Sequence, residues 1–134
     1  MKYYLDTNII IYAINGRYPA IAEHFKKVNP SLIAIPSIVT AEIEYGARKS
    51  RDYNTTMELY NSFFSAFKIV SFDNDMASKY GIIRSELEKD GKIIGPNDLI
   101  IASTVLARDG ILVTNNVKEF KRVEGLELED WTKQ

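Results

Sequence analysis

Short apolar runs alternate with longer amphipathic segments along the whole chain, and the two patterns predict different elements. Short, mostly apolar runs are typical of buried strands, whereas apolar residues spaced three or four apart are typical of helices. Strands are predicted at residues 2–5, 31–35, 68–72, 111–114 and 126–128. Helices are predicted at about residues 7–15, 19–28, 36–49, 52–67, 73–90, 95–108 and 118–120.

This order of elements predicts an α/β fold with a central, mainly parallel sheet of four to five strands. Parallel strands need crossover connections, which the intervening helices supply, and right-handed crossovers place the carboxyl ends of the strands along one edge. A chain of 134 residues can form one ordinary hydrophobic core. We therefore expect a single domain spanning residues 1–134.

The composition excludes several classes of chemistry. The chain has no cysteine, which rules out disulfides and thiolate metal sites and favours a reducing cytoplasm. His24, the single histidine, is expected on a solvated helix face, so histidine metal clusters and Ser-His-Asp catalysis are not indicated. No apolar run approaches the roughly 20 residues of a membrane span, and no signal peptide is evident. We expect a soluble, cytoplasmic protein with no membrane partner.

Asp6 stands where the first predicted strand turns into the first predicted helix. The residue can be explained as a helix N-cap, because aspartate is a preferred capping residue. Ligands of open α/β sheets, however, bind at the carboxyl ends of strands, which makes Asp6 equally a candidate site residue. Asn116 follows the strand at 111–114 and is expected at the same edge.

Glu42 has an unusual position on the predicted helix at 36–49. A helical projection places Glu44 on the opposite side and groups Glu42 with apolar positions: Ile38, Val39, Tyr45 and Gly46. A buried carboxylate is costly unless it is paired or binds a cation. Either a neighbouring Arg or Lys, or a metal ion, must therefore account for Glu42.

Asp98 is the second acid on an apolar helix face. It lies in the first turn of its helix, where the helix dipole favours a carboxylate by about 1 kcal/mol or less. The projection nevertheless groups it with inward positions, namely Ala102, Val105 and Leu106. An exposed partner of the dipole is therefore a poor description of Asp98.

Asp6, Glu42, Asp98 and Asn116 are thus expected around one cleft. Clustered carboxylates repel one another, and a cluster without histidine or cysteine suits hard cations such as Mg²⁺ or Mn²⁺. Such an ion polarises a phosphoryl oxygen and activates water. Hydrolysis of phosphodiester bonds is the reaction that fits this set of residues best.

Four motifs in this order resemble those of PIN-domain ribonucleases, and more narrowly the VapC toxins of toxin–antitoxin pairs. The motifs are Leu5-Asp6-Thr7-Asn8, Thr40-Ala41-Glu42, Gly95-Pro96-Asn97-Asp98 and Leu112-Val113-Thr114-Asn115-Asn116. The resemblance covers essentially the whole chain. It implies a PIN-like, three-layer α/β/α domain and a Mg²⁺-dependent endoribonuclease in which Mn²⁺ can substitute.

The resemblance also implies roles for single residues. Asp6, Glu42 and Asp98 match the three acids that bind metal, and Asn116 matches a fourth motif position that is Asp in many PIN domains. The neutral amide of Asn116 weakens the case for a second tightly held ion. Polar residues match positions that support the acids: Thr7, Asn8 and Thr114.

The same resemblance implies partners for the protein. VapC toxins are usually homodimers, and a VapB antitoxin whose C-terminal segment enters the active-site groove holds them inactive. Operator DNA is then contacted only through the antitoxin. The segment Thr114–Phe120 also resembles the branch of VapC toxins that cuts initiator tRNA in its anticodon stem-loop.

An RNA substrate needs positive charge near the cleft. The candidates follow Glu42 and Asn116 along the chain, and they are Arg48, Lys49, Arg51, Lys118, Lys121 and Arg122. Each of these residues can also be explained as a solvated surface charge. Tyr12 and Tyr45 could stack on unpaired bases, but we predict that both pack in the core.

Two other functions compete with the ribonuclease. A Mg²⁺-dependent phosphatase or phosphotransfer enzyme would use Asp6 as a nucleophile. The haloacid-dehalogenase pattern, however, places an acid two residues further on, where this chain has Asn8. A non-catalytic binding module would need the acids only as helix caps, which leaves Glu42 unexplained.

Overall fold

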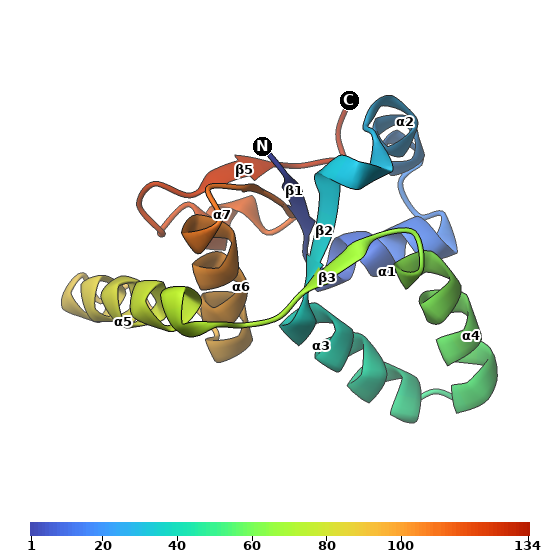
Figure 1. Cartoon of the computed structure of the whole chain (residues 1–134), viewed down its shortest axis with the longest axis horizontal. Coiled ribbons are helices and arrows are strands. Elements are labelled where there is room, and N and C mark those ends of the chain that lie inside the picture. Colours follow the sequence, from blue (N-terminus) through green and yellow to red (C-terminus); the bar gives the residue numbers. More distant parts are fainter.

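A five-stranded parallel sheet forms the centre of the computed structural model, which describes all 134 residues. Its strands run in the order β3-β2-β1-β4-β5, and every neighbouring pair is parallel. The strands are β1 (Tyr3–Leu5), β2 (Ile33–Pro36), β3 (Lys68–Val70), β4 (Ile111–Val113) and β5 (Glu127–Glu129). Figure 1 shows β1 and β2 at the middle of the molecule. The predicted parallel sheet is confirmed, and it has five strands.

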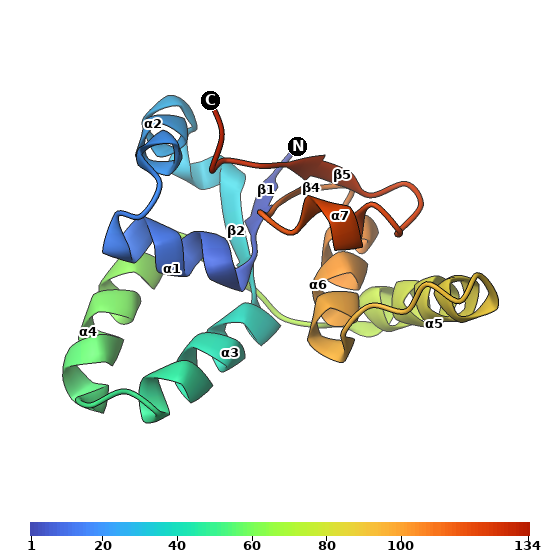
Figure 2. The same cartoon turned by 180° about the vertical axis from the view of Figure 1, so that it is seen from behind.

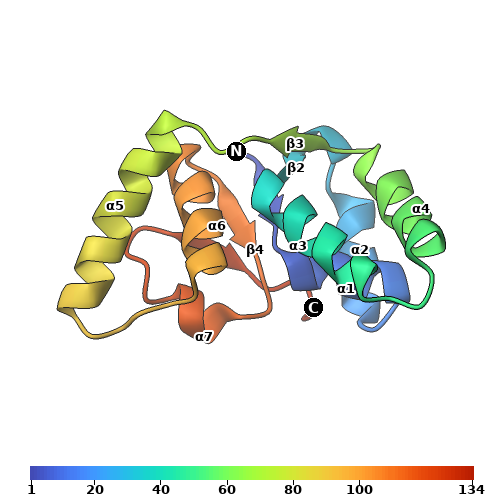
Figure 3. The same cartoon turned by 90° about the horizontal axis from the view of Figure 1, so that it is seen from below.

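Seven α-helices connect the strands and form the outer layers. They are α1 (Thr7–Asn15), α2 (Pro19–Lys27), α3 (Ser37–Arg48), α4 (Tyr53–Phe64), α5 (Asn74–Lys89), α6 (Pro96–Ala107) and α7 (Val117–Phe120). Figure 3 shows α1 to α4 gathered on one side of the molecule and α5 to α7 on the other. None of these helices is long and apolar enough to cross a membrane.

The helix and strand boundaries differ from the prediction mainly where a turn replaces regular structure. A 3₁₀ turn at Pro30–Leu32 delays the start of β2 to Ile33, because proline fixes its own backbone angle and cannot donate to a strand partner. Helix α4 ends at Phe64 rather than near residue 67. Phe63, Phe64 and Phe67 still pack against the core as predicted.

Trp131 anchors the C-terminal end of the chain and corrects the prediction for His24. The indole is fully buried, and the His24 ring lies parallel to it with 5.3 Å between ring centroids. The His24 Nε2 atom is 2.9 Å from the carbonyl oxygen of Lys133. His24 is therefore half-buried at the end of α2 because the C-terminal segment lies across it, and it is not on a solvated face.

The prediction that Tyr45 packs in the core is wrong. The buried face of α3 consists of Val39, Ile43 and Ala47, and Tyr45 lies about 160° around the helix axis from the centre of that face. Tyr45 is 65% exposed, and the ammonium group of Lys49 lies 4.6 Å from the centroid of its ring. Tyr12, in contrast, packs partly buried against the core.

Gly110 leads into β4 at a point where the sheet has no room for a side chain. The turn before it is made by Asp109, whose φ of 51° is left-handed, so Gly110 is not needed for the turn. A Cβ atom at Gly110 would lie 2.5 Å from the Tyr4 ring. The glycine is therefore required by the close approach of Tyr4.

We predict that Gly110→Ala lowers the free energy of unfolding by about 1–3 kcal/mol, because the added methyl group forces the Tyr4 ring and strand β1 to move. Urea unfolding curves measure this change. Gly81→Ala is the matched control, since nothing lies within 4 Å of a Cβ atom there and alanine favours the helix. Equal stability of the two variants would contradict the packing argument.

Candidate active site

Asp6 caps helix α1 and also faces a cavity. Its Oδ1 accepts a hydrogen bond of 3.0 Å from the backbone N–H of Ile9, and its Oδ2 accepts one from the hydroxyl of Thr114. The residue is only 5% exposed. Burial raises its pKa to about 6 against the effect of these two hydrogen bonds, and the charges of Glu42 and Asp130 add to the increase. Asp6 is therefore both the N-cap of α1 and a residue of the cavity, so the two explanations suggested by the sequence are not alternatives.

Glu42 lies at the margin of the buried face of α3 and has no cationic partner. Its Oε1 accepts a hydrogen bond of 2.5 Å from the hydroxyl of Thr7, and its Oε2 accepts one of 3.3 Å from the amide of Asn97. No Lys or Arg forms an ion pair with it. An Arg or Lys therefore does not account for Glu42, whose two oxygens are bonded to the hydroxyl of Thr7 and the amide of Asn97.

Asp98 is half-buried in the first turn of α6. Burial, together with the nearby charges of Glu119, Glu42 and Asp6, raises its pKa to about 6. A helix dipole acting alone would lower the pKa of a carboxyl group in this turn. The pKa of Asp98 is therefore determined by burial and by its acidic neighbours rather than by the helix dipole.

Glu119 completes the acidic cluster, and the sequence interpretation did not include it. Its Oε1 accepts from the backbone N–H of Gly95 at 3.2 Å, and its Oε2 accepts from the side-chain amide of Asn116 at 3.0 Å. The Asn116 hydrogen bond is the main reason that the pKa of Glu119 is lowered. The spacing of Asn116 and Glu119, three residues apart at the start of α7, was the available signal.

A cavity of about 140 Å³ lies between these side chains. Figure 2 shows that the beginnings of α1, α3 and α6 meet near the end of β1, as parallel connections require. The residues that line the cavity are Asp6, Thr7, Asn8, Glu42, Asp98, Ile101, Asn116 and Phe120. The structure thus brings the four predicted residues together, and no Lys or Arg lines the cavity.

Four carboxylates supply a suitable set of oxygen ligands for a hard cation, but their oxygens do not converge on one point. They belong to Asp6, Glu42, Asp98 and Glu119. No group of three or more His, Cys, Asp or Glu side chains is close enough to hold an ion as the side chains stand. Glu42 and Glu119 turn instead toward hydroxyl and amide donors.

The polar residues predicted to support the acids have different roles in the structure. Thr7 donates to Glu42, and Thr114 donates to Asp6. The Thr114 hydroxyl also accepts a hydrogen bond of 3.0 Å from the backbone N–H of Asn116. Asn8 lines the cavity without a hydrogen bond to an acid.

The cations predicted to bind RNA do not line the cavity, and half of them contact other protein groups. The guanidinium group of Arg48 lies over the Tyr53 ring at 3.8 Å and pairs with Glu44. Lys49 lies over Tyr45, and Arg122 donates to the carbonyl oxygen of Ile93. The other three are exposed and form no ion pair: Arg51, Lys118 and Lys121.

Comparison with known proteins matches nearly the whole chain to one family. The model of the PIN domain family matches residues 3–126. The chain is 44% identical over 134 residues to the ribonuclease VapC2 of Rickettsia felis, covering 99% of this chain and 100% of that protein. It is 37% identical over 132 residues to the tRNA(fMet)-specific endonuclease VapC of Shigella flexneri, covering 98% and 99% of the two chains.

A solved structure shows the same architecture. The crystal structure of DNA-bound VapBC from Salmonella typhimurium contains a chain that superposes on this one with a TM-score of 0.92. The two chains are 37% identical, and 98% of each is covered. The chain belongs to the PIN-domain family and, within it, to the VapC ribonucleases.

Proposed function

We propose that this protein is a Mg²⁺-dependent endoribonuclease that acts as the toxin of a toxin–antitoxin pair. The observation that carries the proposal is a small cavity with Asp6, Glu42 and Asp98 on its walls and no cation beside them. Mg²⁺ or Mn²⁺ is the natural partner of such a set of oxygens. Nucleases use this ion to polarise a phosphoryl oxygen and to activate water.

The residues of the site have two roles: some would hold the ion, and others orient the carboxylates that hold it. Asp6, Glu42 and Asp98 would hold the ion, and Glu119 supplies a fourth carboxylate beside Asp98. Thr114 and the N–H of Ile9 fix both oxygens of Asp6. Partners that orient a ligating carboxylate matter for function because they keep it in a productive position.

The residue two positions after Asp6 argues against the phosphatase alternative. An enzyme of that type uses the strand-end aspartate as a nucleophile and a second acid two residues later. Asn8 stands at that position and lines the cavity with a neutral amide. The binding-module alternative again leaves Glu42 without a reason for its position.

Several relatives support an antitoxin as partner. The Salmonella typhimurium chain was solved as VapBC bound to DNA. We infer that a VapB-type antitoxin inhibits this protein, and that operator DNA is bound only through the antitoxin. A homodimer is part of the same proposal.

Initiator tRNA is the substrate that the relatives favour. The Shigella flexneri protein is named a tRNA(fMet)-specific endonuclease, and it matches this chain over nearly its full length. We infer that the anticodon stem-loop of initiator tRNA is cleaved. Its unpaired bases are accessible for recognition in a way that paired bases in an A-form helix are not.

We predict that Glu42→Gln, Asp98→Asn and Glu119→Gln each reduce RNA cleavage by about a hundredfold or more, since the loss of a residue that merely orients a metal ligand already costs about 10–100-fold. Gel-based cleavage in Mg²⁺ measures this, with EDTA expected to stop the parent protein. Glu44→Gln is the matched control, because Glu44 is on the same helix but bonds to Tyr53. Cleavage at the parent rate by all three variants would show that the metal site is placed wrongly.

The raised pKa of Asp98 predicts a change of stability with pH. A carboxyl group whose pKa rises from 3.8 to about 6 on folding stabilises the protein below pH 3.8, and this contribution is lost as the pH rises through 6. In EDTA at pH 8, Asp98→Asn should therefore raise the Tm by roughly 3–5 °C, the shift expected for about 1 kcal/mol. At pH 4 the increase should be much smaller, because Asp98 is then protonated in the folded protein and in a large part of the unfolded chains.

Differential scanning calorimetry at the two pH values measures this prediction. Glu58→Gln is the control, since Glu58 is exposed on α4 and forms no ion pair. The same Tm change for Asp98→Asn at both pH values would mean that charge repulsion does not act on this residue.

The proposed substrate predicts that initiator tRNA is cut at least about tenfold faster than an elongator tRNA or an unstructured RNA of the same length, which corresponds to about 1.4 kcal/mol of discrimination. Single-turnover cleavage with end-labelled RNAs measures the three rates. Mapping of the products should place the cut in the anticodon stem-loop. Equal cleavage rates on all three RNAs would agree with a ribonuclease but would contradict the proposal that initiator tRNA is its specific substrate.

A further inference from the structure

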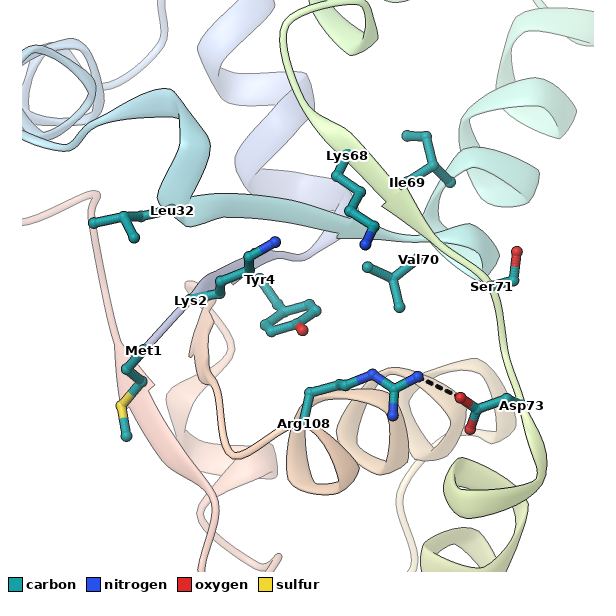
Figure 4. Close-up of a pocket in the computed structure, with 10 residues that line it drawn as sticks. All are labelled: Met1, Lys2, Tyr4, Leu32, Lys68, Ile69, Val70, Ser71, Asp73 and Arg108. Carbon is teal, nitrogen blue, oxygen red and sulfur yellow. Dashed lines mark hydrogen bonds and ion pairs between the residues drawn. The ribbon is translucent and has the colours of Figure 1, made fainter.

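A second, larger hollow lies away from the acidic cavity and has the opposite charge. Its volume is about 750 Å³, within the range of small-molecule sites. Figure 4 shows it between the first strands of the sheet and the end of α6, and its lining residues are Met1, Lys2, Tyr4, Leu32, Lys68, Ile69, Val70, Ser71, Asp73 and Arg108. It shares no lining residue with the acidic cavity. We call it the basic groove.

Cations outnumber acids in the basic groove. Arg108 pairs with Asp73, whereas Lys2 and Lys68 form no ion pair. Figure 4 shows the ammonium group of Lys68 pointing into the groove. Three basic side chains and one acidic side chain leave a net charge of about two positive units in the lining. The groove therefore favours a dianionic ligand.

Tyr4 provides a hydrogen-bond donor at the floor of the groove. The residue is only 3% exposed, and its hydroxyl group has no protein partner. No polar side-chain atom is fully buried without a partner, so the hydroxyl must open to the surface, and the groove is where Figure 4 shows it. A nearly buried hydroxyl without a partner is uncommon, because buried polar groups usually form hydrogen bonds.

The Tyr4 ring cannot easily turn away from the groove. A Cβ atom at Gly110 would lie 2.5 Å from the ring, so the backbone of Gly110 packs directly against it. The ring also belongs to the hydrophobic core. The hydroxyl is therefore held in place beside Lys2, Lys68 and Arg108 rather than free to find another partner.

We propose that the basic groove is a binding site for a phosphate monoester dianion. A tetrahedral group with three terminal oxygens can accept from the Tyr4 hydroxyl and from cations on different walls, whereas a planar carboxylate suits one bidentate partner. Apolar side chains beside these donors, Leu32 and Ile69, would contact the organic body of the ligand. The phosphate can come as free phosphate or as part of a nucleotide.

The basic groove and the acidic cavity are at opposite ends of α6. Arg108 directly follows the helix and Asp98 lies in its first turn, so a helix of 12 residues separates them by about 15–18 Å. A ligand in the groove would connect β1, β3 and the end of α6. The proposal does not depend on the nuclease function, because no residue of the acidic cavity takes part.

Isothermal titration of the full chain with inorganic phosphate and, separately, with AMP tests the proposal. The titrations are done in EDTA, so that phosphate held by a metal in the acidic cavity does not contribute. We expect binding of AMP, and a loss of about tenfold or more in affinity for Tyr4→Phe and for Lys68→Gln, since hydrogen bonds to charged groups contribute about 1.5–3 kcal/mol. Weaker binding of free phosphate than of AMP would identify the nucleotide as the source.

Tyr3→Phe and Lys79→Gln are the matched controls and should bind like the parent protein. Tyr3 lies next to Tyr4 but packs against Trp131, and Lys79 is exposed on α5. Thermal unfolding of each variant checks that it is folded, and Asp98→Asn should bind AMP like the parent whatever its nuclease activity. No binding of either probe at millimolar concentration, or unchanged binding by both groove variants, would overturn the proposal.

Discussion

The hydrogen bond between Thr114 and Asp6 holds the candidate active site together. It joins the ends of β1 and β4, the neighbouring strands whose carboxyl ends face the cavity. The same Thr114 hydroxyl accepts from the N–H of Asn116, whose side chain donates to Glu119, and Glu119 accepts from Gly95 before α6. One series of hydrogen bonds thus fixes two of the acids, Asp6 and Glu119, and connects the ends of β1 and β4 with the beginnings of α7 and α6.

The fold and two of the acids, Glu42 and Asp98, could be predicted from local patterns in the sequence. The strands are short apolar runs and the helices have a clear period, so the layers follow from local pattern alone. Glu42 and Asp98 could be found because an acid on an apolar helix face conflicts with the rule that buried charges are paired. Both indeed lie at the cavity, although Glu42 is at the margin of the buried face rather than within it.

The remaining details depend on contacts that a linear pattern does not contain. Glu119 lies on a helix of four residues, too short to show a period, and its importance comes from its distance to Asp98. Tyr45 was misplaced because α3 is rotated so that Val39, Ile43 and Ala47 form its core face. Gly110 resembles an ordinary helix stop, and only the position of the Tyr4 ring shows why it must be glycine.

The charged residues at the two ends of α6, Asp98 and Arg108, show that the helix dipole does not account for Asp98. Asp98 at its start and Arg108 at its end both have the sign that the helix dipole favours, by about 0.3–1 kcal/mol each. If that were the purpose of Asp98, its pKa would be lowered, but burial and the neighbouring acids raise it to about 6. The free energy lost by keeping this carboxylate charged therefore exceeds what the dipole returns. A residue with a raised pKa, in a cavity with other acids and no basic side chain, is what the proposed metal site predicts for one of its ligands.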